Sequence, residues 1–139
     1  MKTLDTNILV YFIDSSEPVK RQKAIDLVGE LVRQPEPTVL LWQVAVEFLA
    51  QLCRWENQGR HPRTTTEAHA AWLLTAFSIL MPTTTVLSTS LELRSRYSLS
   101  HRDSLLLAGC IDAGVETLYS EDLQAGATYD GVRVVNPFV

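Results

Sequence analysis

The sequence is poor in the features that mark several large classes of protein. Only two of its 139 residues are cysteines, Cys53 and Cys110, and no cysteine and histidine spacing is typical of a zinc site. Both cysteines lie among apolar residues in helix-like segments, so we expect two buried free thiols. The longest apolar-rich run, residues 70–81, is too short to cross a bilayer and predicts a buried helix.

Several functional motifs are also missing. The chain has no Walker loop, no Gly-x-Gly-x-x-Gly and no Gly-x-Ser-x-Gly, which argues against P-loop, dinucleotide-binding and α/β-hydrolase enzymes. A basic leader followed by a small-residue cleavage site is missing too, so we expect a cytoplasmic protein. Positive charge is scarce, and the formal net charge of -4 suits a nucleic-acid enzyme only if a bound divalent metal offsets the acids.

The composition and the apolar pattern of the chain predict a folded α/β domain. Apolar residues make up 46% and charged residues 20%, and no repeat or linker divides residues 1–139, so one domain is expected. Short apolar strands alternate with helical patterns, which predicts a mainly parallel sheet with helices on both faces. The predicted strands end at Leu4 or span residues 38–41, 83–86, 116–119 and 132–135. The predicted helices cover residues 8–13, 44–57, 88–97 and 103–113, a segment running to residue 33, and one carrying residues 72–81.

Four acidic residues occupy positions where such a sheet binds ligands. Asp5 directly follows the first strand and Asp122 follows the fourth, while Asp103 opens a helix and Glu47 lies in the first turns of another. The carboxyl ends of parallel strands meet at one edge of the sheet, so all four can converge there. Clustered carboxylates repel one another unless a cation joins them, and Mg²⁺ and Mn²⁺ prefer oxygen ligands. The pattern therefore predicts a metal site able to activate water at a phosphodiester.

Each acid also has an ordinary structural interpretation. Asp5 can cap a helix, and Asp103 completes a Ser-x-x-acid capping box that starts at Ser100. Glu47 can belong to a solvated helix face, and Asp122 can be a turn residue. No single acid decides between these interpretations, and their joint placement favours the functional one.

Basic residues gather at two places in the chain. One group comes just before Asp103 and consists of Arg94, Arg96, His101 and Arg102. The second group lies within residues 54–63. Either group can hold phosphates or simply coat the surface. Arg96 and Arg102 are the candidates for contact with RNA.

Three segments resemble a known family. Residues 4–11 (LDTNILVY) are similar to the start of PIN-domain ribonucleases of the VapC toxin type. Residues 119–123 (YSEDL) and 103–108 (DSLLLA) resemble two further motifs of these proteins. Near the end, the resemblance extends to Gly126, Gly131 and residues 136–138 (NPF).

This resemblance implies a three-layer α/β/α sandwich and an endoribonuclease dependent on Mg²⁺ or Mn²⁺. It implies that Asp5, Glu47, Asp103 and Asp122 form an acidic quartet, with Asp5 and Asp103 as direct metal ligands. Asn7 and Ser120 would orient the quartet through hydrogen bonds. The resemblance further implies a homodimer, an RNA substrate and a cognate antitoxin protein, as in a bacterial type II toxin–antitoxin system.

Other functions remain to be weighed against this one. A PIN-fold scaffold that binds RNA or protein without cutting has the same fold, although the intact acid set argues against it. A receiver-type signalling domain needs a lysine late in the chain, and the last lysine here is Lys23. A haloacid-dehalogenase phosphatase needs an aspartate two positions after the first, where this chain has Asn7.

Overall fold

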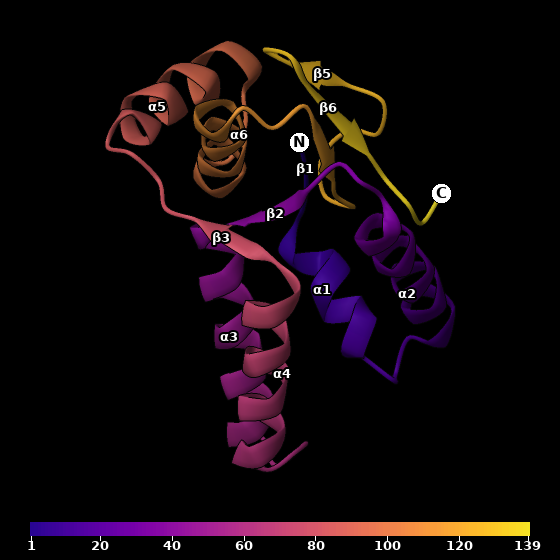
Figure 1. Cartoon of the computed structure of the whole chain (residues 1–139). Coiled ribbons are helices and arrows are strands. Elements are labelled where there is room, and N and C mark those ends of the chain that lie inside the picture. The colour runs from indigo at the N-terminus through magenta and orange to yellow at the C-terminus, as the bar shows by residue number, and fades with distance from the viewer.

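A six-stranded sheet forms the centre of the computed structural model, which describes residues 1–139 (Figure 1). The strands lie in the order β3-β2-β1-β4-β6-β5, and every neighbouring pair is parallel except β5 and β6. The predicted mainly parallel sheet is therefore confirmed. The strands are β1 (Lys2–Leu4), β2 (Thr38–Leu41), β3 (Ser78–Leu80), β4 (Thr117–Tyr119), β5 (Thr128–Tyr129) and β6 (Val132–Val135).

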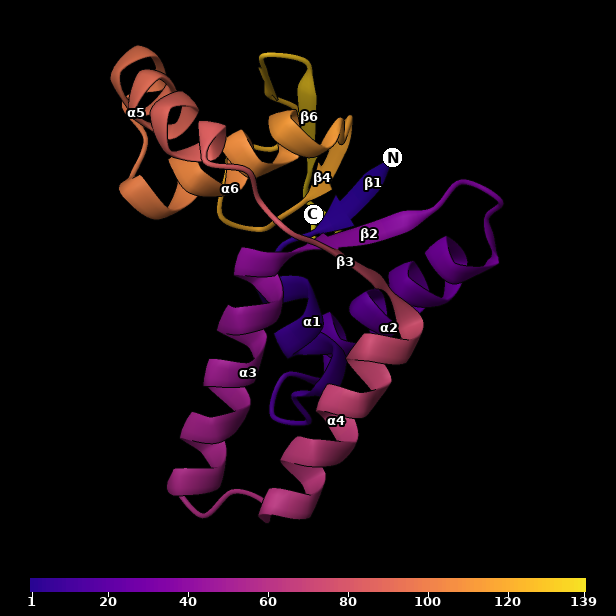
Figure 2. The same cartoon turned by 60° about the vertical axis from the view of Figure 1, so that its left-hand side comes forward.

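Helices cover both faces of this sheet. In Figure 1, α5 and α6 lie on one side of the strands, with α1 and α2 on the other. Figure 2 shows α3 and α4 projecting from the sheet as a pair of adjacent helices joined by a short loop. None of the helices combines the length and apolar character that a membrane span requires. The helices are α1 (Thr6–Ile13), α2 (Pro18–Arg33), α3 (Trp42–Asn57), α4 (Arg63–Ala76), α5 (Thr85–Tyr97) and α6 (His101–Ala113).

Local sequence explains where several helices begin and end. Pro18 is at the first position of α2, where a missing backbone N–H costs nothing. Gly114 ends α6 in the left-handed conformation, with φ of 74°. The helices predicted to begin at residues 88 and 103 are α5 and α6, which begin three and two residues earlier, at Thr85 and His101. Differences of this size are usual for helix ends.

The third strand was predicted at the wrong place. Residues 83–86 contain the start of α5, while the strand is Ser78–Leu80, inside the segment predicted to be the end of a helix. Helix α4 stops at Ala76, and β3 pairs with β2 in the register Val39 to Ser78. A short apolar run is compatible with either a buried helix or a strand, so its periodicity alone does not decide between them.

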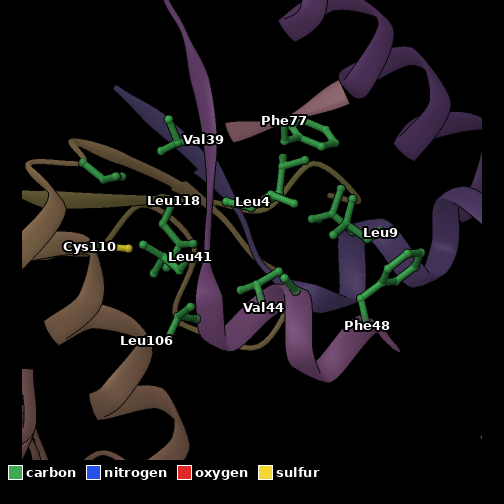
Figure 3. Packing of buried hydrophobic residues seen from close by; sticks show 14 of the residues in the cluster. Leu4, Leu9, Val39, Leu41, Val44, Phe48, Phe77, Leu106, Cys110 and Leu118 are labelled. Carbon is green, nitrogen blue, oxygen red and sulfur yellow. The ribbon is translucent and has the colours of Figure 1, made fainter. Parts of the chain in front are cut away.

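The core lies between the sheet and its helices and fixes the elements that carry the acids. Figure 3 shows Leu4 and Leu118 of the two central strands close to side chains from α3 and α6. Leu4, Leu118 and Phe48 are all fully buried. The predicted apolar stripe of α3 is confirmed as core, with Val44, Phe48, Leu52 and Trp55 buried. The stripe turns one face of α3 inward and leaves Glu47 on a different face.

The two cysteines differ in exposure. Cys110 is buried, and burial raises the pKa of its thiol to about 12, whereas Cys53 is exposed. The prediction of two buried thiols is thus wrong for Cys53, which follows buried Leu52 in α3 and so projects about 100° further round the helix.

A thiol-specific colour reagent should therefore label one cysteine in the native protein and two in denaturant. The thiolate is the reactive form, so a buried thiol with a raised pKa reacts only after unfolding. The Cys53→Ala variant serves as the control and should show no rapid labelling. Rapid labelling of two thiols in the native wild-type protein would contradict the described burial.

Candidate active site

The four predicted acids meet at the carboxyl edge of the sheet, around one arginine. Asp5 follows β1, and Asp122 comes three residues after β4, the neighbouring strand. Glu47 is in α3 and Asp103 is in the first turn of α6. Arg102 forms ion pairs with all four, at N···O distances of 2.6 Å to Asp5, 2.8 Å to Glu47, 3.2 Å to Asp103 and 3.9 Å to Asp122.

Asp5 lies at the centre of this arrangement and is completely buried. Its Oδ1 accepts hydrogen bonds from the backbone N–H of Thr6 at 2.6 Å and from Arg102 Nη2 at 2.6 Å. Its Oδ2 accepts from Ser120 Oγ at 2.7 Å and from Arg102 Nη1 at 3.3 Å. Asp5 is also the N-cap of α1, which confirms the cap interpretation, and the same side chain lies among the other three acids. These hydrogen bonds offset the cost of burying a carboxylate.

Ser120 and Asn7 lie beside the acids, and Ser120 hydrogen-bonds one of them directly. Ser120 Oγ donates to Asp5 and accepts from the backbone N–H of Asp122 at 3.1 Å, so one hydroxyl connects the acids that follow β1 and β4. Asn7 Oδ1 accepts a long hydrogen bond of 3.5 Å from the backbone N–H of Glu121. Its Nδ2 is buried and has no partner in the chain. Asn7 is also part of the lining of the cleft described below.

Glu47 faces the site from α3 rather than bulk solvent. Its Oε2 accepts from Thr6 Oγ1 at 3.2 Å and from Arg102 Nε and Nη2 at 3.1 and 2.8 Å. Thr6 was not among the predicted residues, although its place directly after Asp5 is a signal for it. Three contacts to one oxygen orient a side chain that is still 32% exposed.

Asp103 is partly buried, and Asp122 is the most exposed acid of the quartet. Asp103 is held at the start of α6, where its backbone N–H donates to Ser100 Oγ at 3.1 Å, which confirms Ser100 as the N-cap. The side chain of Asp122 is 54% exposed. Partial burial and the nearby charge of Asp5 both raise the pKa of Asp122. The cluster therefore carries more negative charge than its single arginine neutralises.

Arg102 is the main residue whose role at this edge the sequence did not reveal. Burial alone would lower the pKa of its guanidinium, but hydrogen bonds to Asp5 and Glu47 raise it further above its usual value, so it stays charged. It was predicted only as a possible RNA contact, from its place among basic residues. Arg96, the other predicted contact, pairs instead with Asp130 and Glu92, and no ion pair joins it to the quartet.

A polar cleft gives access to the acids. It has a volume of about 470 Å³ and opens between α1, the start of α2, α3 and the first turn of α6. Its lining includes Thr6, Asn7, Glu47, Arg102 and Asp122. A larger, mostly apolar cavity of about 570 Å³ lies elsewhere, and its lining includes Met81 and Leu87 but none of the four acids.

The donor set fits a hard divalent cation. The four side chains offer only carboxylate oxygens, and Ser120, Thr6 and Asn7 add polar atoms at the same edge. In the present side-chain positions no three acids lie close enough to hold one metal ion. The carboxylates are spaced around the guanidinium of Arg102, with N···O distances of 2.6 to 3.3 Å to Asp5, Glu47 and Asp103. These distances are longer than a Mg–O bond, which is roughly 2.1 Å.

Comparison with known proteins identifies the family. No curated protein matches the chain in sequence. A toxin–antitoxin complex from Klebsiella pneumoniae has a similar structure, with a TM-score of 0.69, 21% identity, and coverage of 99% of this chain and 98% of the other. VapBC2 from Rickettsia felis, bound to a promoter DNA fragment, gives 0.68 and 14%, with 96% of each chain covered. Mycobacterium tuberculosis VapC20, a toxin that cleaves the sarcin–ricin loop, gives 0.61 and 17%, with coverage of 88% and 90%.

These likenesses, all at 21% identity or less, show the same fold. The PIN domain family matches residues 2–129, which is most of the chain and includes all four acids. The chain therefore belongs to the PIN domain family.

Proposed function

We propose that this protein is a metal-dependent endoribonuclease and the toxin of a toxin–antitoxin pair. The observation that carries the proposal is the convergence of four carboxylates, from four separate segments, on one cation at the carboxyl edge of a parallel sheet. The family membership and the VapC-type structural neighbours agree with it. VapC20 cleaves an RNA loop, which supports RNA as the substrate class here.

The chemistry assigns a different task to each part of the site. Asp5 and Asp103 would bind Mg²⁺ or Mn²⁺ directly, with Glu47 and Asp122 acting through water or a second ion. The bound ion would supply Lewis acidity, which activates water for in-line attack on the phosphodiester and stabilises the developing charge. Ser120 holds Asp5 in place through its hydrogen bond to Oδ2. Hydrolysis would leave a 5′-phosphate and a 3′-hydroxyl.

The proposal includes the setting in which the protein works. One structural neighbour is a toxin–antitoxin complex and another is VapBC2. Both support a cognate antitoxin for this chain. We also propose a homodimer, in the cytoplasm, made of single PIN-like domains spanning residues 1–139. Size-exclusion chromatography with light scattering measures the oligomeric state directly.

Cleavage of total RNA by the purified protein, free of any partner, tests the activity. We expect discrete fragments in Mg²⁺ or Mn²⁺ and intact RNA in EDTA, because the carboxylates need the metal to act on water. Restoring excess metal to the EDTA sample should restore cleavage. Intact RNA under every condition, together with no metal binding, would instead favour a PIN scaffold that does not cut.

A further inference from the structure

Arg102 makes an unusually complete set of contacts with the acids. Its Nε donates to Glu47, its Nη1 donates to Asp5 and Asp103, and its Nη2 donates to Asp5, Glu47 and, at 3.4 Å, Thr6. A guanidinium has five N–H donors in a fixed plane, and here all three nitrogens face site oxygens. Arg102 therefore lies among the oxygens that a metal would use.

The hydrogen bonds at Asp5 leave no room for both cations. A carboxylate has about four lone-pair positions, and Asp5 accepts four hydrogen bonds. Two come from Thr6 and Ser120, which are part of the fold, and two come from Arg102. A metal bound to Asp5 needs a lone pair that Arg102 now uses, and the two positive charges would repel one another at this distance.

Arg102 occupies a helix position that is unfavourable for a cation, so we attribute the placement of its side chain to the acids. It is the second residue of α6, where the positive end of the helix dipole disfavours a cation. Its backbone is anchored separately, because Gln43 Nε2 donates to the carbonyl oxygen of Arg102 at 3.2 Å. The side chain is 34% exposed and lines the cleft, so it can turn outward without moving the backbone.

We propose that Arg102 is an internal competitor of the metal, occupying the carboxylates of Asp5, Glu47 and Asp103 until a divalent ion displaces its guanidinium towards the cleft mouth. This inference rests on the metal site of the proposed function. Arg102 therefore stabilises the metal-free protein and lowers its affinity for the ion. Once displaced, the guanidinium remains beside the cleft, where the phosphates of a bound RNA would lie.

Calorimetric titration of the metal-free protein with Mn²⁺ alone, without RNA, tests this competition. The Arg102→Met variant keeps a long side chain but removes the charge, and should bind Mn²⁺ at least about tenfold more tightly than wild type. Its melting temperature in EDTA should fall, because the acids lose their only nearby cation, and Mn²⁺ should raise it by more than in wild type. Arg133→Met, an exposed residue in the first half of β6, is the matched control and should change neither quantity.

A second variant keeps the test decisive if Arg102→Met fails to fold. Arg102→Lys retains a positive charge but not the fork that spans three acids, so it should bind Mn²⁺ more tightly than wild type. If wild type binds Mn²⁺ and every variant that folds binds it equally or more weakly, the competition is overturned and the proposed nuclease still stands. Failure of wild type and variants alike to bind Mn²⁺ would overturn both proposals.

Discussion

Asp5→Asn should reduce metal-dependent RNA cleavage by about a thousandfold or more. Asp5 is the buried centre of the acid cluster, and the amide that replaces it has one donor group and no charge to hold a metal. A metal contributes several kcal/mol to lowering the barrier, and each 1.4 kcal/mol or so is a factor of ten in rate. The measurement is the initial rate of cleavage of a defined RNA in Mn²⁺, with protein concentrations matched.

Two controls separate lost chemistry from lost structure. Asn still offers an oxygen to the N–H of Thr6, so α1 keeps its cap, and circular dichroism should show a folded variant. Asp26→Asn removes an acid of the same kind from the exposed side of α2, where its contact is with Gln22 of the same helix. It should cleave at the wild-type rate. A fully active Asp5→Asn protein would contradict the role given to the quartet.

Leu93→Ala should lower the free energy of unfolding by about 2 to 5 kcal/mol, the range for removing a fully buried leucine. Leu93 is in α5 and has no exposed surface. Total stabilities of small domains are only about 5 to 15 kcal/mol, so this loss is large. Helix α5 packs on α6, which carries Arg102 and Asp103, so the substitution also weakens the support of the site. Urea denaturation followed by circular dichroism measures the change.

Leu91→Ala supplies a control with the same chemistry on the same helix. Leu91 is 60% exposed, two residues away from Leu93. Its truncation should change the free energy of unfolding by less than about 1 kcal/mol, since surface substitutions rarely do more. Equal losses in the two variants would mean that α5 does not bury the face described here.

The acids could be predicted because parallel strands impose a simple rule. Residues at the carboxyl ends of adjacent strands, such as Asp5 after β1 and Asp122 after β4, share one edge whatever the intervening chain does. The prediction of Glu47 needed more information, because its place at the site depends on which face of α3 is buried. The stripe that includes Val44 and Phe48 supplies that information through its helical spacing.

The same reasoning could not predict the contacts of Arg102 or the position of β3, for different reasons. A cation at the start of a helix can point to solvent or back across the helix end, and spacing along the chain does not distinguish these directions. Only the tertiary arrangement brings Asp5, which follows β1, and Glu47 of α3 within reach of Arg102. Strand β3 has three residues, too few for alternation to show, and it exists because β2 offers a free edge beside it.

The order of strands has a consequence for how the protein is made. Strand β1 is synthesised first, yet it lies between β2 and β4, and β4 begins more than a hundred residues later at Thr117. Ser120 and Asp122, which complete the environment of Asp5, leave the ribosome later still. A nascent chain that has not reached this point holds an incomplete acid cluster, with Asp5 lacking its neighbour strand. Under the proposed function, RNA cleavage can therefore begin only after synthesis has passed Asp122.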